Sequence, residues 1–171
     1  MRLNTLKKNN VLIVGIAGNL AYNLNLNNTI YPNDNENNSA DVSDNFIMVG
    51  ASTNNLNENL RSSSSSYGNI DVDIFAPGSR INTTMTNNEH TTSGGTSSAA
   101  AVTSGVAVLI RSYYPELTAS QVKHILMNSG IEYTFNVKVE DTLLPFNTLS
   151  KSGKIVNAYN ALIMADSLSR E

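Results

Sequence analysis

The chain of 171 residues contains no cysteine. Disulfide bonds and thiolate-ligated metal sites are therefore excluded, and the redox compartment is left open. Positive charge is also sparse, because the eleven lysines and arginines are scattered along the chain and the formal net charge is −3. A nucleic-acid groove requires a concentrated basic surface, so we expect no nucleic-acid partner.

Long apolar runs are absent as well. The first ten residues lack the apolar core of a signal peptide, and no later run is long enough to span a bilayer. We therefore expect no membrane partner, and the localisation stays unknown. The composition, 40% hydrophobic and 15% charged, is ordinary for one globular domain with a core.

The most informative stretch that is present runs from residue 93 to residue 110. A glycine pair, Gly94-Gly95, precedes Thr96-Ser97 and a segment rich in alanine and valine, which predicts a buried helix. The first N–H groups of a helix have no partner within it, and the helix dipole favours negative charge there. A hydroxyl group and part of an anion site are thus expected together at Ser97.

Two other interpretations fit this stretch taken alone. Short Gly/Thr/Ser clusters are common N-caps with no further role. The order Gly95-Thr96-Ser97-Ser98-Ala99 also imitates the Gly-x-Ser-x-Gly elbow of α/β-hydrolases. That elbow must follow a hydrophobic strand, whereas residues 87–92 are polar, so the elbow interpretation is weak.

Three apolar segments predict strands. Residues 11–17 form a continuous β-branched run, typical of a strand covered on both faces, and end in Gly18-Asn19. Residues 45–51 predict a second buried strand. Residues 70–75 alternate apolar and acidic side chains, which predicts a strand with one face in solvent, near the edge of the sheet.

The acidic residues of the third segment are Asp71 and Asp73. Both are candidates for a catalytic acid by residue type alone. Because they occupy alternate positions of a strand with a predicted solvent face, we expect them to be solvated and not catalytic.

Helix signals follow the serine stretch. The first helix should end near Tyr113-Tyr114, since Pro115 cannot continue it. Thr118 to Gln121 is a capping-box pattern for a second helix that ends at Gly130. Residues 131–139 alternate as a half-buried ribbon, and Asn157 is the expected N-cap of a last helix.

Three motifs together resemble one family, the subtilisin-like serine peptidases or subtilases. They are the nucleophile motif, with matches at Gly95, Thr96, Ser97, Ala99, Ala100 and Gly105, the strand end Ala17-Gly18-Asn19, and Ala76-Pro77-Gly78. The resemblance covers about residues 10–165. It implies an α/β fold of three layers, with a mostly parallel sheet and helices on both faces.

The resemblance also implies an activity, serine-type endopeptidase action on polypeptide substrates through an acyl-enzyme. Ser97 would be the nucleophile, and Asn19 would hold the oxyanion together with the Ser97 N–H. Gly15, Ala17 and Gly18 would form one wall of the substrate cleft. The chemistry requires no metal or cofactor, and although subtilases often bind structural calcium, the sequence places no such site.

Two motifs of the family have no counterpart in this sequence. The family's acid lies in Asp-[Ser/Thr]-Gly and its base in His-Gly-Thr-His, whereas the histidines here are His90 and His124. His90 lies among polar loop residues with no orienting acid nearby, and His124 lies on a predicted helix face, so neither is expected to be the base.

Residues 1–171 are therefore expected to be the C-terminal part of one subtilase catalytic domain. The N-terminal part of the same domain would be its partner, and the isolated chain would be inactive. For the full-length family member, secretion would be expected.

A different class of function stays open. The chain could be a noncatalytic remnant or pseudopeptidase that serves as a binding or structural module. A nucleotide-binding α/β protein is a weaker alternative, because residues 15–19 do not supply the Gly-x-Gly-x-x-Gly turn that it requires after the first strand.

Overall fold

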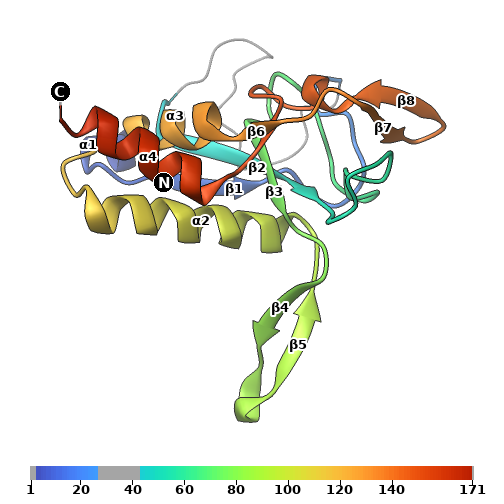
Figure 1. Cartoon of the computed structure of the whole chain (residues 1–171), viewed down its shortest axis with the longest axis horizontal. Coiled ribbons are helices and arrows are strands. Elements are labelled where there is room, and N and C mark those ends of the chain that lie inside the picture. The colour runs from blue at the N-terminus through green and yellow to red at the C-terminus, as the bar shows by residue number, and fades with distance from the viewer. Residues whose placement is uncertain (1–2, 27–42, 171) are drawn as a thin grey trace.

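The computed structural model describes residues 3–26 and 43–170 of the chain. Five strands form one sheet in the order β1-β2-β3-β9-β6 (Figure 1). Their bounds are β1 Ile13–Ile16, β2 Phe46–Ser52, β3 Ile74–Pro77, β9 Lys154–Ile155 and β6 Ile131–Glu132. Strands β1, β2, β3 and β9 are parallel, and β6 is antiparallel to β9. The sheet is therefore mostly parallel, as predicted.

Strand β2 is the buried centre of this sheet. All seven of its residues are buried, and its side chains alternate between two hydrophobic clusters. Ile47, Val49 and Ala51 point to one cluster, while Phe46 and Met48 point to the other. This is the pattern of a strand covered on both faces.

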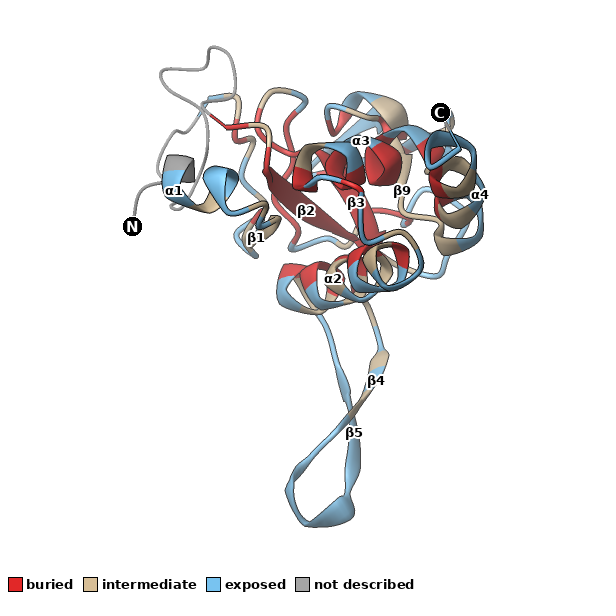
Figure 2. Ribbon diagram, turned by 90° about the vertical axis from the view of Figure 1, so that its left-hand side faces the viewer, coloured by how far each residue is buried: buried red, intermediate tan, exposed pale blue. Residues whose placement is uncertain are grey.

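Three helices contribute to the hydrophobic cluster on one face of the sheet, and the longest of them runs along that face (Figure 2). They are α2 Thr96–Tyr113, α3 Ala119–Ser129 and α4 Ala158–Leu168, and a short helix, α1 Leu3–Lys8, precedes β1. The predicted helix ends are confirmed at three places. Helix α2 ends before Pro115, and Thr118 and Gln121 form a capping box at the start of α3. The Asn157 side chain caps α4. Gly130 is the C-cap of α3 but is extended, with φ of −60°.

The other face is covered by irregular segments and a hairpin. The hairpin consists of β7 Asn136–Val139 and β8 Thr142–Pro145, followed by a 3-10 turn at Phe146–Thr148. Its Val137 and Val139 join Phe46, Phe75 and Phe146 in the second hydrophobic cluster, where the Phe75 and Phe146 rings lie 5.0 Å apart. Together with the sheet and the helices this makes the three layers of the predicted α/β fold.

Two strand predictions need correction. The third strand begins at Ile74 rather than residue 70, and it lies between β2 and β9, not at the edge. Asp73 is fully buried and Asp71 is 7% exposed, so the alternation did not mark a solvent face. Strand β1 is only half-buried, with Ile16 41% exposed, because it has β2 as its one neighbour among the described residues.

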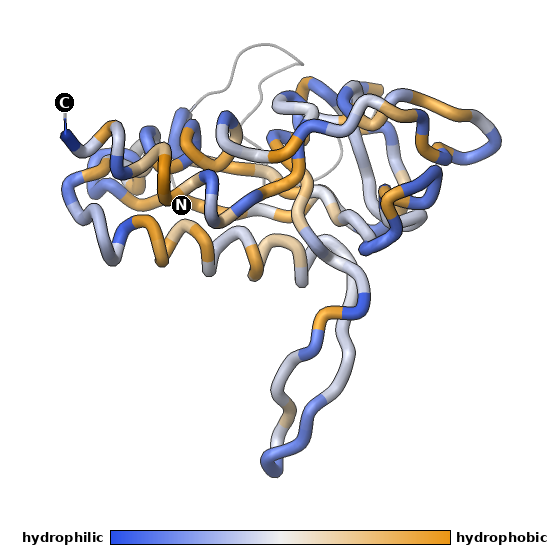
Figure 3. Tube along the Cα trace, viewed as in Figure 1, coloured by the Kyte–Doolittle hydropathy of each residue, from blue (hydrophilic) through white to orange (hydrophobic). Residues whose placement is uncertain are grey.

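A second hairpin projects from the body of the molecule (Figure 1). It consists of β4 Ile81–Thr84 and β5 His90–Ser93, joined by a 3-10 turn at Thr86–Asn88. All four residues of β5 are exposed, and the hairpin is mostly hydrophilic (Figure 3). It connects the end of β3 directly to the start of α2.

Candidate active site

The start of α2 is packed tightly against the end of β3. Gly95 is the N-cap, with φ of 101°, and its N–H donates to the Gly78 carbonyl oxygen at 2.6 Å. A Cβ at Gly78 would lie 2.7 Å from Ala51 Cβ and 2.8 Å from the Gly95 carbonyl oxygen. Glycine is therefore required at both positions, at Gly95 by the left-handed backbone and at Gly78 by the close approach.

Asn19 is held against this helix start by a long-range contact. It follows β1 through Gly18, whose φ is 90°, and its Oδ1 accepts hydrogen bonds from the Thr96 N–H at 2.9 Å and the Thr96 hydroxyl at 3.1 Å. Because Oδ1 is occupied by Thr96, the amide group Nδ2 is the donor that Asn19 has left to offer. Thr96 itself is fully buried, and no local pattern in the sequence indicates its part in this contact.

Ser97 lies in the first turn of α2 and is exposed. The N–H groups of Ser98 and Ala99 bond back to the Gly95 carbonyl, and Ser98 Oγ contacts Ser93 Oγ at 3.2 Å. In residues 3–26 and 43–170, the Ser97 N–H has no such acceptor. Two N–H donors, from Ser97 and Asn19, thus lie at a helix N-terminus beside an exposed serine hydroxyl.

The three predicted cleft residues lie on the segment that leads to Asn19. A Cβ at Gly15 would come within 2.5 Å of the Phe46 ring, and Ala17 is fully buried with its N–H bonded to the Val49 carbonyl. The Gly18 carbonyl oxygen accepts from the Ser66 N–H. Packing accounts for small residues at Gly15 and Ala17, and the positive φ of 90° accounts for glycine at Gly18. Their contact with substrate stays a prediction.

Neither histidine lies near Ser97. His90 pairs with Thr84 at the outer end of the β4–β5 hairpin, three residues beyond Ser93, which is about 10 Å along an extended strand. On α3, the exposed His124 places Nε2 3.1 Å from Asp44. Burial alone would raise the pKa of Asp44, but hydrogen bonds from Ser120 and His124 outweigh it and lower that pKa.

Asp73 belongs to a buried ion cluster at the opposite end of β3 from the helix start. Its Oδ2 accepts from the Met48 N–H at 2.7 Å, and its Oδ1 lies 3.1 Å from Lys151 Nζ and 3.6 Å from Lys123 Nζ. Burial raises the pKa of Asp73, although both lysines act against that shift. The expectation of a solvated carboxylate was wrong because its partners come from α3 and from the segment before β9.

Metal-ligating side chains are not gathered anywhere in the described part of the chain, which holds no group of three or more His, Cys, Asp or Glu residues suited to an ion. Nor does that part include a helix with the length and apolar character to cross a membrane.

A sequence model of the subtilase family matches residues 1–155. The chain belongs to the subtilase family. Subtilisin DY from Bacillus licheniformis is 35% identical over 120 residues, which are 70% of this chain and 39% of that protein. The subtilase chain described here therefore spans well under half of this curated relative.

Solved structures agree with the family. A structure of the subtilase cytotoxin SubAB assembly has a TM-score of 0.75 at 25% identity, and the match covers 98% of this subtilase chain and 53% of the other. The A-subunit of the AB5 toxin from E. coli has a TM-score of 0.73 at 25% identity, with 95% and 53% covered. The three-layer fold is thereby confirmed, and about half of each of these relatives has no counterpart here.

Proposed function

We propose that Ser97 is the nucleophile of a serine endopeptidase site and that Asn19 is its oxyanion donor. One observation carries the proposal: the bonds from Thr96 to Asn19 Oδ1 bring the Asn19 amide to the N-terminus of the helix that bears Ser97. Membership of the subtilase family supports serine peptidase chemistry. The roles of the individual residues are our inference.

In the proposed reaction, Ser97 Oγ attacks the scissile carbonyl carbon and loses its proton to a base. The negative charge that develops on the carbonyl oxygen is stabilised by the Asn19 Nδ2 and Ser97 N–H donors. The C–N bond then breaks, the amine leaves with a proton, and water hydrolyses the acyl-serine. In a subtilisin, removing one such donor lowers turnover by about 10²–10³.

The base and its orienting acid would come from the N-terminal part of a subtilase domain. Among the described residues, the two histidines lie on the hairpin and on α3, away from the start of α2. Loss of one triad member in a subtilisin costs up to about 10⁶ in turnover. The chain alone should therefore not hydrolyse peptides at an enzyme-like rate.

A noncatalytic scaffold is the second candidate. It is favoured by the position of the two histidines away from Ser97. A scaffold would retain the fold and bind a partner or peptide without acyl transfer. The two candidates differ in what Ser97 does when a base is supplied.

The test is to co-express the chain with the part of subtilisin DY that precedes its aligned region. The complex should react with a fluorophosphonate probe and cleave a chromogenic peptide, whereas the chain alone should do neither. Ser97→Ala should abolish both signals, while the control Ser98→Ala should retain labelling. Labelling of the complex that survives Ser97→Ala would disprove the assignment of the nucleophile, and turnover by the chain alone would reveal a base within it.

A further inference from the structure

Arg61 is a buried cation that the proposed reaction does not use. It comes after β2 in the chain and is 4% exposed. Its Nη1 donates to the carbonyl oxygens of Ser65 at 2.5 Å and Ser63 at 3.3 Å, and its Nε donates to the Lys138 carbonyl oxygen at 3.3 Å. Residues 62–66, here called the serine segment, are five consecutive serines. The guanidinium group of Arg61 thus binds the backbone of a segment that has no apolar side chain to bury.

The serine segment lies against the loop that carries Asn19. The Ser66 N–H donates to the Gly18 carbonyl oxygen at 2.9 Å, and the Ser64 carbonyl oxygen accepts from the Ala21 N–H at 2.8 Å. Gly18 directly precedes Asn19, and Ala21 follows it by two residues. The two hydrogen bonds therefore hold the backbone on both sides of Asn19.

The loop around Asn19 has an unusual backbone and little burial. Gly18 has φ of 90° and Ala21 has φ of 56°. A residue with a Cβ is uncommon in the left-handed region and stays there only where its surroundings hold it. Asn19 is exposed and Leu20 is 63% exposed, so the loop is not fixed by burial of its own side chains. The bonds to the serine segment therefore determine where Asn19 lies.

The serine segment itself depends on Arg61. Serine side chains contribute little hydrophobic stabilisation, so hydrogen bonds have to hold the segment in place. Burial lowers the pKa of Arg61, while Tyr67 and Glu140 act against that shift. A buried cation is tolerated only where it is well bonded. Without the guanidinium group, the buried carbonyl of Ser65 would lose this donor and the segment would shift to find another.

We propose that Arg61 is a positioning residue for the Asn19 amide. The guanidinium group fixes the serine segment, and the segment fixes the backbone of Asn19. Thr96 fixes Oδ1 at the other end of the same side chain. Nδ2 is thereby held at the start of α2 from both ends. The proposal rests on the proposed function, in which Asn19 stabilises the oxyanion.

The first experiment reads the position of Asn19 in the chain alone, by NMR of its side-chain amide. The signal is assigned by its loss in Asn19→Asp. Arg61→Met keeps an apolar stem but removes every donor, and it should shift or broaden that signal. Ser65→Ala should shift it less, because it removes only the hydroxyl that accepts from the Ala51 N–H at 2.9 Å.

Val122→Ala is the control for loss of stability. Val122 is fully buried on α3, in the cluster on the helix-covered face of the sheet. Its substitution should destabilise the chain and leave the Asn19 amide signal in place. An amide signal that stays unchanged in Arg61→Met and Ser65→Ala would overturn the proposal.

The second experiment measures turnover in the complex with the N-terminal part of subtilisin DY. Asn19→Ala should lower kcat by about 10²–10³. Arg61→Met should lower kcat at least about fivefold and change KM less than about twofold, since the oxyanion exists only in the transition state. Arg61→Lys, which keeps the charge and a donor, should recover part of the loss. In the Asn19→Ala background, Arg61→Met should have no further effect on kcat, because no amide is left to position.

The double variant separates positioning from general support of the fold. Additive losses from Asn19→Ala and Arg61→Met would show that Arg61 acts by another route and would overturn the proposal. A rise in KM at unchanged kcat would do the same. A complex that neither labels nor cleaves would refute the proposed function, and a displaced Asn19 amide in Arg61→Met would still support the positioning role.

Discussion

Gly95 combines two constraints in one residue. Its φ of 101° disfavours any residue with a Cβ, and a Cβ there would lie 3.0 Å from Asn19 Oδ1 and 3.2 Å from Nδ2. The same glycine thus permits the turn into α2 and leaves room for the Asn19 amide. Backbone conformation and the proposed oxyanion donor are coupled at this position.

Gly95→Ala should therefore destabilise the chain by about 1–3 kcal/mol through the backbone alone, because φ of 101° with ψ of 178° is a conformation essentially restricted to glycine. The substitution should also displace the Asn19 amide. In the complex with an N-terminal half, the fluorophosphonate probe should therefore label Ser97 more slowly than the loss of folding stability alone would explain. Urea unfolding and labelling rates measure the two effects. Gly105→Ala is the control, because nothing lies within 4 Å of its Cβ position and the helix should tolerate it. Unchanged labelling by Gly95→Ala would contradict the coupling.

The ion cluster of Asp73 gives a second prediction at this scale. Asp73→Asn would leave Lys123, whose side chain is 2% exposed, without the carboxylate beside it. Removing one partner of a buried ion pair costs about 3–5 kcal/mol, and we expect a loss of that size in urea unfolding. Glu58→Gln, which breaks the exposed pair with Lys138, should cost less than about 1 kcal/mol. Equal losses in the two variants would show that burial does not strengthen the cluster.

Helix α3 is tied to the segment before β2 by a carboxylate. Asp44 accepts from the Ser120 hydroxyl and contacts His124, and these bonds lower its pKa below the usual value of 3.8. A group with a lowered folded-state pKa adds stability above its unfolded pKa and loses it as the pH falls through the folded value. The link between α3 and β2 should thus weaken in acid.

The difference in unfolding free energy between the parent chain and Asp44→Asn should accordingly be fully present above the ordinary aspartate pKa of 3.8 and should decrease as the pH falls below it. Urea unfolding over this range measures it. Ser120→Ala should show part of the same effect because it removes one of the bonds to Asp44. A difference that grows toward acid pH would mean that the pKa of Asp44 is raised rather than lowered in the folded chain.

At the scale of elements, the sequence predicted the helix ends that are determined by neighbouring residues. The start and end of α3 follow from the Thr118–Gln121 capping box and Gly130, and the end of α2 follows from Pro115. The alternating apolar and acidic residues before β3 led to a wrong prediction of a solvent face. The pattern is the same whether a carboxylate contacts water or the ammonium group of a lysine. Lys123 lies fifty residues from Asp73, and only the packing of α3 on the sheet brings them together.

The candidate site was predictable in part for the same reason. Ser97 and Asn19 stand in motifs that the sequence shows, and the structure places both at the start of α2. The contact that joins them runs through Thr96, 77 positions from Asn19, and no local pattern specifies it. The half-burial of β1 was also not predictable from the sequence. Its apolar run is typical of a strand covered on both faces, but the described residues do not cover it completely.

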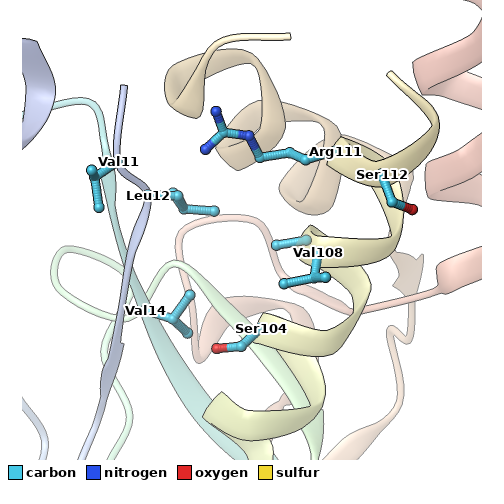
Figure 4. Close-up of a pocket in the computed structure, with 8 residues that line it drawn as sticks. Val11, Leu12, Val14, Ser104, Val108, Arg111 and Ser112 are labelled. Atoms are coloured by element: carbon cyan, nitrogen blue, oxygen red, sulfur yellow. The ribbon is translucent and has the colours of Figure 1, made fainter. Parts of the chain in front are cut away.

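For the whole molecule, the outer edge of β1, which pairs with no strand among residues 3–26 and 43–170, should determine how the chain behaves in solution. An apolar groove of about 430 Å³ lies beside it, between β1 and α2, and Val14 and Val108 are among its lining residues (Figure 4). An exposed, apolar edge strand pairs with other chains. We expect the isolated chain to self-associate as its concentration rises, as measured by light scattering and size exclusion. Val14→Pro and Val108→Asp should suppress this, while Ile163→Asp should not. A parent chain that stays monomeric at high concentration, with a cooperative thermal transition, would contradict the expectation.

The projecting β4–β5 hairpin makes the molecule convenient to observe. Its outer turn at Thr86–Asn88 has no buried residue, and the sequence contains no cysteine that would compete for a thiol reagent. A single Glu89→Cys substitution would therefore accept one fluorophore, on an exposed arm whose base adjoins Ser97. Energy transfer from that dye to one on an added N-terminal half would report assembly in real time, without any substrate being cleaved.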